Sequence, residues 1–491
     1  MNKKILYGMF VMAFSNFAVA QTQIGSNIIG AVLGEDTGTS VSISSTILGD
    51  RVAIGTPYND LATTMSGYVR VYQRSGTVWN QLGQTINGEA ASDFFGEVQL
   101  SGNGTRLIVG AKFNDGNGAN SGHVRVYTFD SGTATWVQMG ADINGEALGD
   151  EFGTTVSISY SGTIIAVGAP KNNLNGTTED SGHIRIYEWN GTAWTQKGVD
   201  INGNAANDQF GESIAMSPSG VNLVAGSKWA NSSNGYVEVY TWNGTAWAQK
   251  GVTISDGGTD KSGSSVSISS DGNRVVVGAP LAGASGQGNV KVYSYSGSAW
   301  TQFGSTISGW VNGGNLGTSV SITDAGDAMV VGMPNYINGS FTFAGLMVYY
   351  KHNGTAWASV GTVVTGSATN DELGTALAIS ADGNKVVVGA PVSNNTTGHA
   401  RIYDYTTALS TNIFTINDSF KMHPNPSKNN FELSSNKNII INEVNVYSLQ
   451  GQLIKAFKNQ NQYDVSDLAK GIYMVKINTG EGLASKKLIV E

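Results

Sequence analysis

The sequence has no cysteine, little proline and few charged residues. The absence of cysteine from 491 residues excludes disulfides, thiolate metal sites and cysteine nucleophiles. The G-x-S-x-G nucleophile motif and the H-E-x-x-H zinc motif are also missing. Charged residues make up 13% of the chain, so solubility must depend on Ser, Thr, Asn and Gly. No apolar run after residue 20 is long enough to span a membrane.

The first 20 residues predict a secretory signal peptide. Lys3 and Lys4 form the basic start, residues 5–14 the apolar core and residues 18–20 a small-residue cleavage site. A membrane anchor is the alternative, but the apolar stretch is short and Asn16 interrupts it. We therefore expect an exported chain whose mature form begins at Gln21.

The net charge of −8 is distributed unevenly. Residues 1–20 and 412–491 each contribute +2, which leaves about −12 on residues 21–411. An acidic body of this kind is unsuited to non-specific binding of nucleic acid or anionic lipid. We expect no nucleic-acid partner.

One sequence unit occurs seven times, at intervals of 52–58 residues. Each copy contains a G-T-S-V-S-I-S-like run, a V-V-G-A-P-like run and a G-x-V-x-V-Y run, and six copies add an A-W-T-Q-x-G-x-x-I run. Alternating and β-branched runs predict four strands per unit, and such a period is typical of a β-propeller with one unit per blade. The units open at Gly38, Gly96, Gly153, Gly211, Gly263, Gly317 and Gly374.

Residues that recur at one position of the unit are expected to be structural. His123, His183 and His399 share one position, and equivalent residues of separate blades cannot form one metal site. We predict no metal, no cofactor and no catalytic residue. A tryptophan also recurs in the fourth strand and predicts packing between blades, at Trp79, Trp136, Trp194, Trp247, Trp300 and Trp357.

Acids near the opening glycine recur together with basic residues of the third strand. The sixth unit lacks both, which predicts a structural ion pair within the blades. The acids are Asp36, Asp93, Asp150, Asp208, Asp260 and Asp371. The bases are Arg70, Arg125, Arg185, Lys291 and Arg401.

The seventh unit lacks its fourth strand, and the start of the mature chain has the missing pattern. Residues 22–28 match residues 301–307 of the fifth unit. We predict that this N-terminal segment supplies the outer strand of the last blade. The ring would then close without an exposed sheet edge.

The repeats resemble a known family of propellers. The Phe-Gly pairs at 95–96, 152–153 and 210–211, each followed by a Val-Gly-Ala-Pro-like run, resemble the FG-GAP repeats of integrin-α-type propellers. The resemblance covers about residues 22–406. Many such repeats hold calcium in a D-x-D-x-D-G loop, but the loops here, such as S-S-D-G-N-R at 269–274, lack those carboxylates. Calcium binding of that kind is not expected.

The C-terminal tail contains an ordered set of motifs. They are M-H-P-N-P-S at 422–427, V-N-V-Y-S-L-Q-G-Q-L-I-K at 444–455, D-V-S-D-L-A-K-G-I-Y-M-V-K-I at 464–477 and the terminal S-K-K-L-I-V-E. This tail resembles the type A C-terminal sorting domain of the type IX secretion system. The resemblance implies a small β-sandwich recognised by the type IX secretion machinery, with the cargo released or attached to the cell surface. An ordinary accessory β domain is the alternative.

These patterns predict an all-β chain. We expect a signal peptide at 1–20, a seven-bladed β-propeller at 21–407 closed by an N-terminal strand, a linker at 408–418 and a β-sandwich sorting domain at 419–491. The product would be a monomer without a transmembrane span, secreted or on the outer-membrane cell surface.

Departures from the repeat indicate where a ligand binds. Loops between strands two and three, and between strand four and the next strand one, should emerge on the same rim of the propeller. Non-repeating aromatics in these loops suit sugar stacking or protein contact, although the loops could instead fold over them. These residues are Trp310, Tyr336, Phe341, Phe343, Trp229, Tyr58 and Phe113.

The leading functional hypothesis is a binding or adhesion module for a glycan or protein, which uses this rim and is not an enzyme. A glycan lyase or hydrolase is the first alternative; a cluster of non-repeating carboxylates at one channel mouth would favour it, and the sequence shows none. A structural surface component without a discrete site is the second alternative.

Overall fold

The computed structural model describes residues 21–491 except 47–48, 59–63, 174–178, 256–259, 394–396, 410–419, 436–438, 449–452, 459, 461 and 480–481. The predicted signal peptide and most of the predicted linker lie outside these residues.

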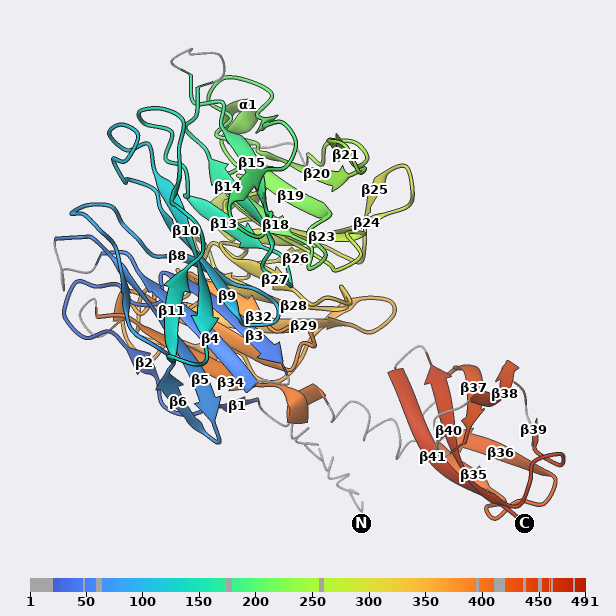
Figure 1. Ribbon diagram of the computed structural model, residues 1–491. Helices are drawn as coiled ribbons and strands as arrows, with labels where there is room; N and C mark the ends of the chain where they lie inside the picture. Colours follow the sequence, from blue (N-terminus) through green and yellow to red (C-terminus); the bar gives the residue numbers. More distant parts are fainter. Residues whose placement is uncertain are drawn as a thin grey trace, which may run out of the picture.

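Seven antiparallel sheets form the blades of a closed ring (Figure 1). Each innermost strand contacts the innermost strand of the next blade, and β32 contacts β3, which closes the ring. The innermost strands are β3 (Ser40–Thr46), β8 (Glu97–Leu100), β13 (Thr155–Ile158), β18 (Ser213–Met216), β22 (Ser265–Ile268), β27 (Val320–Ile322) and β32 (Leu377–Ile379). The predicted seven-bladed propeller is confirmed.

The second and third strands of each blade form the core. The V-V-V-G runs of the second strands are almost wholly buried, because neighbouring blades cover both faces of each sheet. The second strands are β4 (Gly49–Thr56), β9 (Arg106–Ala111), β14 (Ile164–Ala169), β19 (Asn222–Ser227), β23 (Arg274–Ala279), β28 (Ala328–Met333) and β33 (Lys385–Ala390). The third strands are β5 (Tyr68–Ser75), β10 (His123–Asp130), β15 (His183–Trp189), β20 (Tyr236–Trp242), β24 (Asn289–Tyr295), β29 (Leu346–His352) and β34 (His399–Asp404). Two short helical elements, α1 (Ala230–Ser233) and η2 (Ala282–Gly286), lie between strands two and three of blades four and five.

The predicted fourth strand is two short strands in most blades. The glycine of A-W-T-Q-x-G-x-x-I turns the chain with a positive φ, +77° at Gly83, so the run cannot continue as one strand. Both pieces pair with the third strand. The first pieces are β6 (Val78–Gln81), β11 (Thr135–Gln138), β16 (Trp194–Gln196), β21 (Trp247–Gln249), β25 (Trp300–Gln302) and β30 (Trp357–Ser359). The second pieces are β7 (Ile86–Asn87), β12 (Ile143–Asn144), β17 (Ile201–Asn202), β26 (Ile307–Ser308) and β31 (Val364–Thr365).

The N-terminal segment completes the seventh blade, as predicted. Strands β1 (Thr22–Gln23) and β2 (Ile28–Ile29) pair antiparallel with β34, at the places that the outer pieces occupy in other blades. Ile24 and Ile28 are buried between blades seven and one. The last sheet edge is therefore covered by the beginning of the chain.

The recurring tryptophans connect neighbouring blades. Each indole N–H donates to a backbone carbonyl of the preceding blade; Trp136 donates to Leu82 at 2.9 Å, and Trp79 donates to Ile24 of the closing segment at 3.0 Å. The prediction of packing between blades is confirmed for all six tryptophans.

Hydroxyl groups of the innermost strands also join the blades. Ser42 Oγ accepts the N–H of Leu100 in the next blade at 3.0 Å, and Ser157 Oγ accepts the N–H of Met216 at 3.0 Å. Small polar side chains thereby satisfy backbone groups that face the channel and have no strand partner. This explains the many Ser and Thr residues of the first strand.

The C-terminal domain has a core of its own, formed by residues between Phe420 and Val490. One sheet contains β35 (Phe420–His423), β36 (Asn430–Ser435) and β39 (Tyr463–Asp464). The other has the order β38 (Leu453–Lys458), β37 (Ile441–Tyr447), β40 (Gly471–Thr479) and β41 (Gly482–Val490). The predicted two-sheet β domain is present.

Across the described part of the chain, helices are too short or too polar to serve as a membrane span.

Candidate functional site at one mouth of the channel

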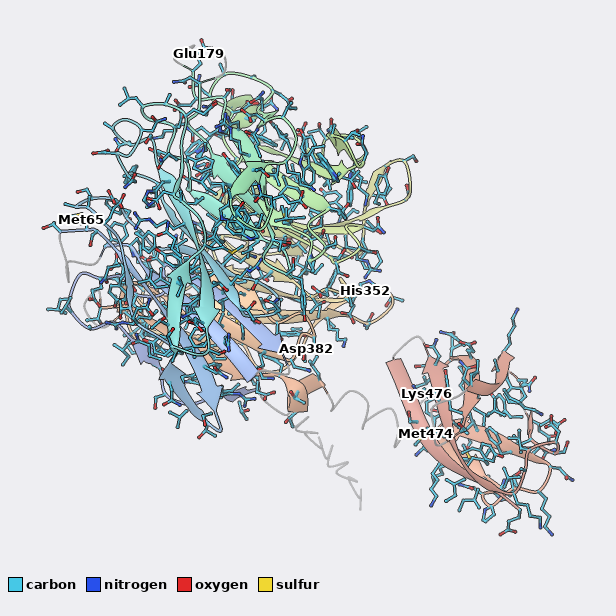
Figure 2. All side chains as sticks on the ribbon, viewed as in Figure 1. Met65, Glu179, His352, Asp382, Met474 and Lys476 are labelled. Atoms are coloured by element: carbon cyan, nitrogen blue, oxygen red, sulfur yellow. The ribbon has the colours of Figure 1, made fainter. Side chains whose placement is uncertain are left out.

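The ends of the blade strands place the variable loops on one rim. Because adjacent strands are antiparallel, the loop from strand two to strand three and the link from one blade to the next emerge at the same end. In Figure 2, Met65 and Glu179, from loops of this kind, lie on one side of the propeller. His352 and Asp382, from turns at the opposite strand ends, lie on the other side. We call the end of the channel at which the innermost strands begin the channel mouth.

A ring of seven left-handed residues surrounds the channel mouth. The residue two positions before each opening glycine has a φ between +50° and +60°, although none is glycine. This conformation is costly for ordinary residues and is tolerated where the surrounding structure demands it. The seven side chains are of six types, so the chemistry of the mouth varies from sector to sector: Asp36, Phe94, Glu151, Gln209, Lys261, Asn315 and Glu372.

Three aromatic rings meet in the sector of blades one and two. Tyr58 and Phe94 lie 5.0 Å apart between ring centroids at an interplanar angle of 89°, and Phe94 and Phe113 lie 5.0 Å apart at 86°. These edge-to-face contacts join two predicted residues through Phe94, which the sequence analysis did not select. The Lys112 ammonium lies 4.9 Å from the centroid of the Phe113 ring.

A small pocket of about 90 Å³ lies beside these rings. Tyr58, Phe94 and Pro57 form its apolar wall, and Glu97 and Lys112 supply charges of opposite sign. Glu97 and Thr39 also line the central channel, so the pocket opens on the channel mouth. Its other lining residues are Gly96, Gly110, Gly153 and Thr154.

Glu97 departs from the repeat. Its register partner on the second strand is Gly110, and the residues in the same register in most other blades are hydroxyl residues such as Thr155 and Ser213. Burial raises the pKa of Glu97 to about 7, while a hydrogen bond from Ser40 and the Lys112 charge act in the opposite direction. The group therefore exists in both protonation states near neutral pH.

Glu212 is a second non-repeating carboxylate on the channel wall. It forms an ion pair with Lys228, and its Oε2 atom is buried without a hydrogen-bond partner among the described residues. Glu97 and Glu212 are not among the site residues predicted from the sequence. A signal was available, because both directly follow an opening glycine where five units have Ser or Thr.

The other predicted rim aromatics do not join this cluster. Trp229 is 38% exposed, but the Lys261 ammonium lies 3.8 Å from its ring centroid, which is a cation–π contact within the chain. Tyr336 packs partly against the core of blades five and six. Trp310, Phe341 and Phe343 are exposed, and among the described side chains no ring contact joins them to one another or to Tyr336.

The predicted ion pair within the blades is wrong for most units. Arg125 pairs with Glu89 and Asp142 rather than with Asp93. Asp93 instead accepts the backbone N–H of Ala90 at 3.1 Å, so it stabilises the turn between blades. The same turn contact recurs at Asp150, Asp208 and Asp371.

The repeated acid before the opening glycine has a further contact in blade seven and is a different residue in blade one. In blade seven the predicted partners do approach, with 3.8 Å between Arg401 and Asp371. In the first unit the equivalent residue is Glu35 rather than Asp36, and it accepts the N–H of Ala31 at 2.5 Å. The alignment in the first unit was therefore wrong by one residue, because the acid there is Glu instead of Asp.

A histidine and two carboxylates converge beside Arg125. His123 Nδ1 lies 3.6 Å from Glu89 and 4.0 Å from Asp142, and burial lowers the pKa of His123 to about 4, so the ring is neutral. The carboxylates already have donors: Asp142 accepts Nε and Nη2 of Arg125 at 3.0 and 2.9 Å, and Glu89 accepts Asn114 at 2.8 Å. Because the guanidinium supplies the positive charge, the group works as a structural ion cluster.

The same cluster recurs in the third blade, from Glu146, His183, Arg185 and Asp200. Repetition in successive blades supports a structural role, as expected for the shared histidine position.

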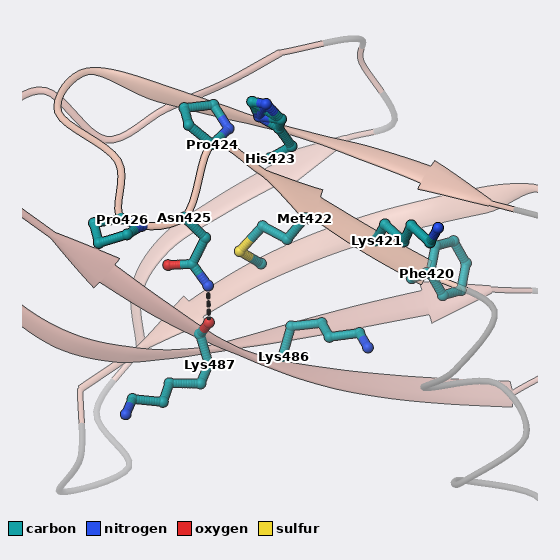
Figure 3. Close-up of a pocket in the computed structure, with 9 residues that line it drawn as sticks. All are labelled: Phe420, Lys421, Met422, His423, Pro424, Asn425, Pro426, Lys486 and Lys487. Atoms are coloured by element: carbon teal, nitrogen blue, oxygen red, sulfur yellow. Dashed lines mark hydrogen bonds between the residues drawn. The ribbon is translucent and has the colours of Figure 1, made fainter.

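The sorting-domain motif M-H-P-N-P borders a groove of about 660 Å³ (Figure 3). Asn425 donates its side-chain N–H to the carbonyl of Lys487 at 2.7 Å and accepts the backbone N–H of Ile489 at 2.8 Å. The amide thus covers part of the free edge of β41, the last strand. The groove is lined by Phe420, Lys421, Met422, His423, Pro424, Asn425, Pro426, Lys486 and Lys487.

Comparisons with known proteins concern the tail and the fold. Residues 421–491 match the family described as secretion system C-terminal sorting domain. No curated protein matches the chain. A chain of hydrazine synthase from Kuenenia stuttgartiensis is similar in structure, with 12% identity, a TM-score of 0.49, and coverage of 77% of this chain and 97% of that one. The FG-GAP resemblance of the repeats stays a prediction. The matched tail indicates export through the type IX secretion machinery, and places the product outside the cell or on the outer-membrane surface.

Proposed function

We propose that the protein is an exported binding module that holds a glycan or protein at the channel mouth, and that adhesion is its role at the cell surface. One observation supports this most directly: Tyr58, Phe94 and Phe113 converge beside a pocket with a carboxyl and an ammonium group. Aromatic walls with a few convergent polar groups are typical of ligand sites.

The departures from the repeat support the same location. Structural side chains recur in most blades, as the tryptophans and the turn aspartates do. Tyr58 and Phe94 occupy positions that vary between blades, Glu97 replaces a hydroxyl residue, and the three meet at one pocket. Non-repeating residues that lie together in the fold indicate a binding site more than scattered variation of surface residues does.

Binding of the mature chain, residues 21–491, to arrays of glycans and extracellular-matrix proteins tests the proposal. We expect a ligand whose affinity falls about tenfold or more in Tyr58→Ala and Phe94→Ala, the loss of about 1.4 kcal/mol expected for an aromatic contact residue. Tyr160→Ala is the matched control, because Tyr160 is 50% exposed at the opposite end of the channel. Intact binding in both test variants, or loss only in Trp310→Ala and Tyr336→Ala, would contradict this location.

The two channel carboxylates favour a second candidate function, a glycan lyase or hydrolase. Burial raises the pKa of Glu97, and Glu212 forms an ion pair with Lys228, so the two carboxyl groups of the channel wall lie in different environments. Cleavage of a glycan from the array would support an enzyme. The cleavage rate should then fall about a hundredfold or more in Glu97→Gln and in Glu212→Gln. Unchanged glycan after prolonged incubation would exclude it for that ligand.

A further inference from the structure

The pocket is sized for the end of a ligand rather than for a whole one. Its volume of about 90 Å³ lies well below the roughly 300–1,000 Å³ of sites that enclose small molecules. It is open to the channel mouth through Glu97 and Thr39. A terminal group of a longer chain therefore fits this geometry.

The contacts divide the aromatic cluster by role. Tyr58 and Phe94 line the pocket, whereas Phe113 does not. Phe113 supports Phe94 from behind, and Lys112 already lies over its ring. Tyr58 is 41% exposed, so part of its ring is free to contact a ligand.

The charges of the pocket select against charged end groups. When Glu97 is ionised, its charge and that of Lys112 have opposite signs and interact, so the pocket in this state has no net charge to match an ion. The surrounding chain is acidic, which disfavours an anion further. An ammonium group would meet Lys112, which repels it.

The protonation of Glu97 points to hydroxyl groups. With a pKa of about 7, the carboxyl changes its hydrogen-bonding pattern across neutral pH. An ammonium ligand requires the ionised form and an anion requires the neutral one. A hydroxyl both donates and accepts, so it pairs with either form.

We propose, on the basis of the function proposed above, that this pocket binds the uncharged terminal sugar of a glycan. The sugar hydroxyls hydrogen-bond with the carboxyl of Glu97, and an apolar face of the sugar ring lies on Tyr58 and Phe94.

Competition by free monosaccharides tests the ligand class with the mature chain, residues 21–491. The probes are glucose, galactose, mannose and N-acetylglucosamine as neutral sugars, glucosamine as a cation and N-acetylneuraminic acid as an anion. We expect a neutral sugar to displace the array glycan at the lowest concentration. We also expect its affinity to change less than about threefold between pH 6 and 8, because either form of Glu97 accepts it.

Substitutions in the pocket test which residues contact the sugar. Tyr58→Leu and Glu97→Ala should each weaken binding of the neutral sugar about tenfold, Glu97→Gln should weaken it less, and Tyr160→Ala should leave it unchanged. The melting temperature of every variant should also be measured. A value equal to that of the parent would show that the loss of sugar binding arises at the substituted residue and not from unfolding.

Three outcomes would overturn the inference. Strongest competition by glucosamine or N-acetylneuraminic acid would contradict the uncharged end group. Binding of proteins only, weakened in Tyr58→Leu, would contradict the sugar and leave the proposed binding function intact. Absence of binding to every glycan and protein on the arrays would contradict both proposals.

Discussion

Single residues at the channel mouth determine how the seam between blades seven and one responds to pH. Asp36 of the first blade is half-buried, and burial together with the nearby Glu372 of the last blade raises its pKa from 3.8 to about 6. The folded protein therefore binds a proton at Asp36 more tightly than the unfolded chain does. This stabilising contribution is present at low pH and is lost as the pH rises through about 6.

Asp36→Asn should remove this dependence. We expect the melting temperature of the variant to exceed that of the parent by about 1–3 °C at pH 7.5, and the difference to shrink towards pH 4.5, because Asn has no charge to repel Glu372. Thermal unfolding across this pH range measures it. Asn also favours the left-handed conformation, so only the change of the difference with pH bears on the mechanism. A constant difference at every pH would contradict it.

At the scale of strands, two short segments have an effect out of proportion to their length. Strands β1 and β2 contain two residues each, yet they cover the outer part of β34 and bury Ile24 and Ile28. Ile24 also accepts the Trp79 indole N–H, so the segment connects blade seven to blade one. In a chain without disulfides, this pairing closes the ring.

Deletion of residues 21–30 should therefore destabilise the propeller sharply. Loss of two buried isoleucines, at about 1.5–3 kcal/mol each, predicts a melting temperature lower by about 5 °C or more. Gln23→Ala is the matched control, because its side chain is exposed while its backbone pairing remains. Differential scanning calorimetry compares them, and superimposable curves for deletion and parent would refute closure by this segment.

At the scale of the whole molecule, the chain contains two separate kinds of core. Seven apolar clusters contain only residues 24–409, and one contains only residues 420–490. Groups of residues with separate cores are expected to fold independently. Export and the proposed ligand binding thus belong to different parts of the chain.

Removal of residues 419–491 should separate these tasks. We expect the unfolding transition of the propeller to stay within about 2 °C of its value in the full chain, because none of its core residues is lost. Delivery to the cell surface should be abolished in a bacterium with the type IX machinery, as followed by fractionation. A truncated chain that still reaches the surface would contradict the assigned role of the tail.

Much of the architecture follows from the sequence because its determinants are local and repeated. Glycine spacing, β-branched runs and the recurring tryptophans each specify a strand or a contact between neighbours, and seven copies reinforce one another. The displaced fourth-strand pattern at residues 22–28 likewise predicted the closure. The break of that pattern into two strands was missed, because it depends on one positive φ per unit.

The candidate site depended on tertiary structure. Tyr58, Phe94 and Glu97 are distant in sequence or lie on different elements, and only the ring places them around one pocket. The partners of Arg125 are Glu89, in the link that precedes its blade, and Asp142, directly before β12, whereas the sequence pattern predicted Asp93. The repeated framework follows from the sequence alone, since each blade is built from local pairings. Which irregular residues meet is set by the tertiary structure, since it depends on how seven blades close around one axis.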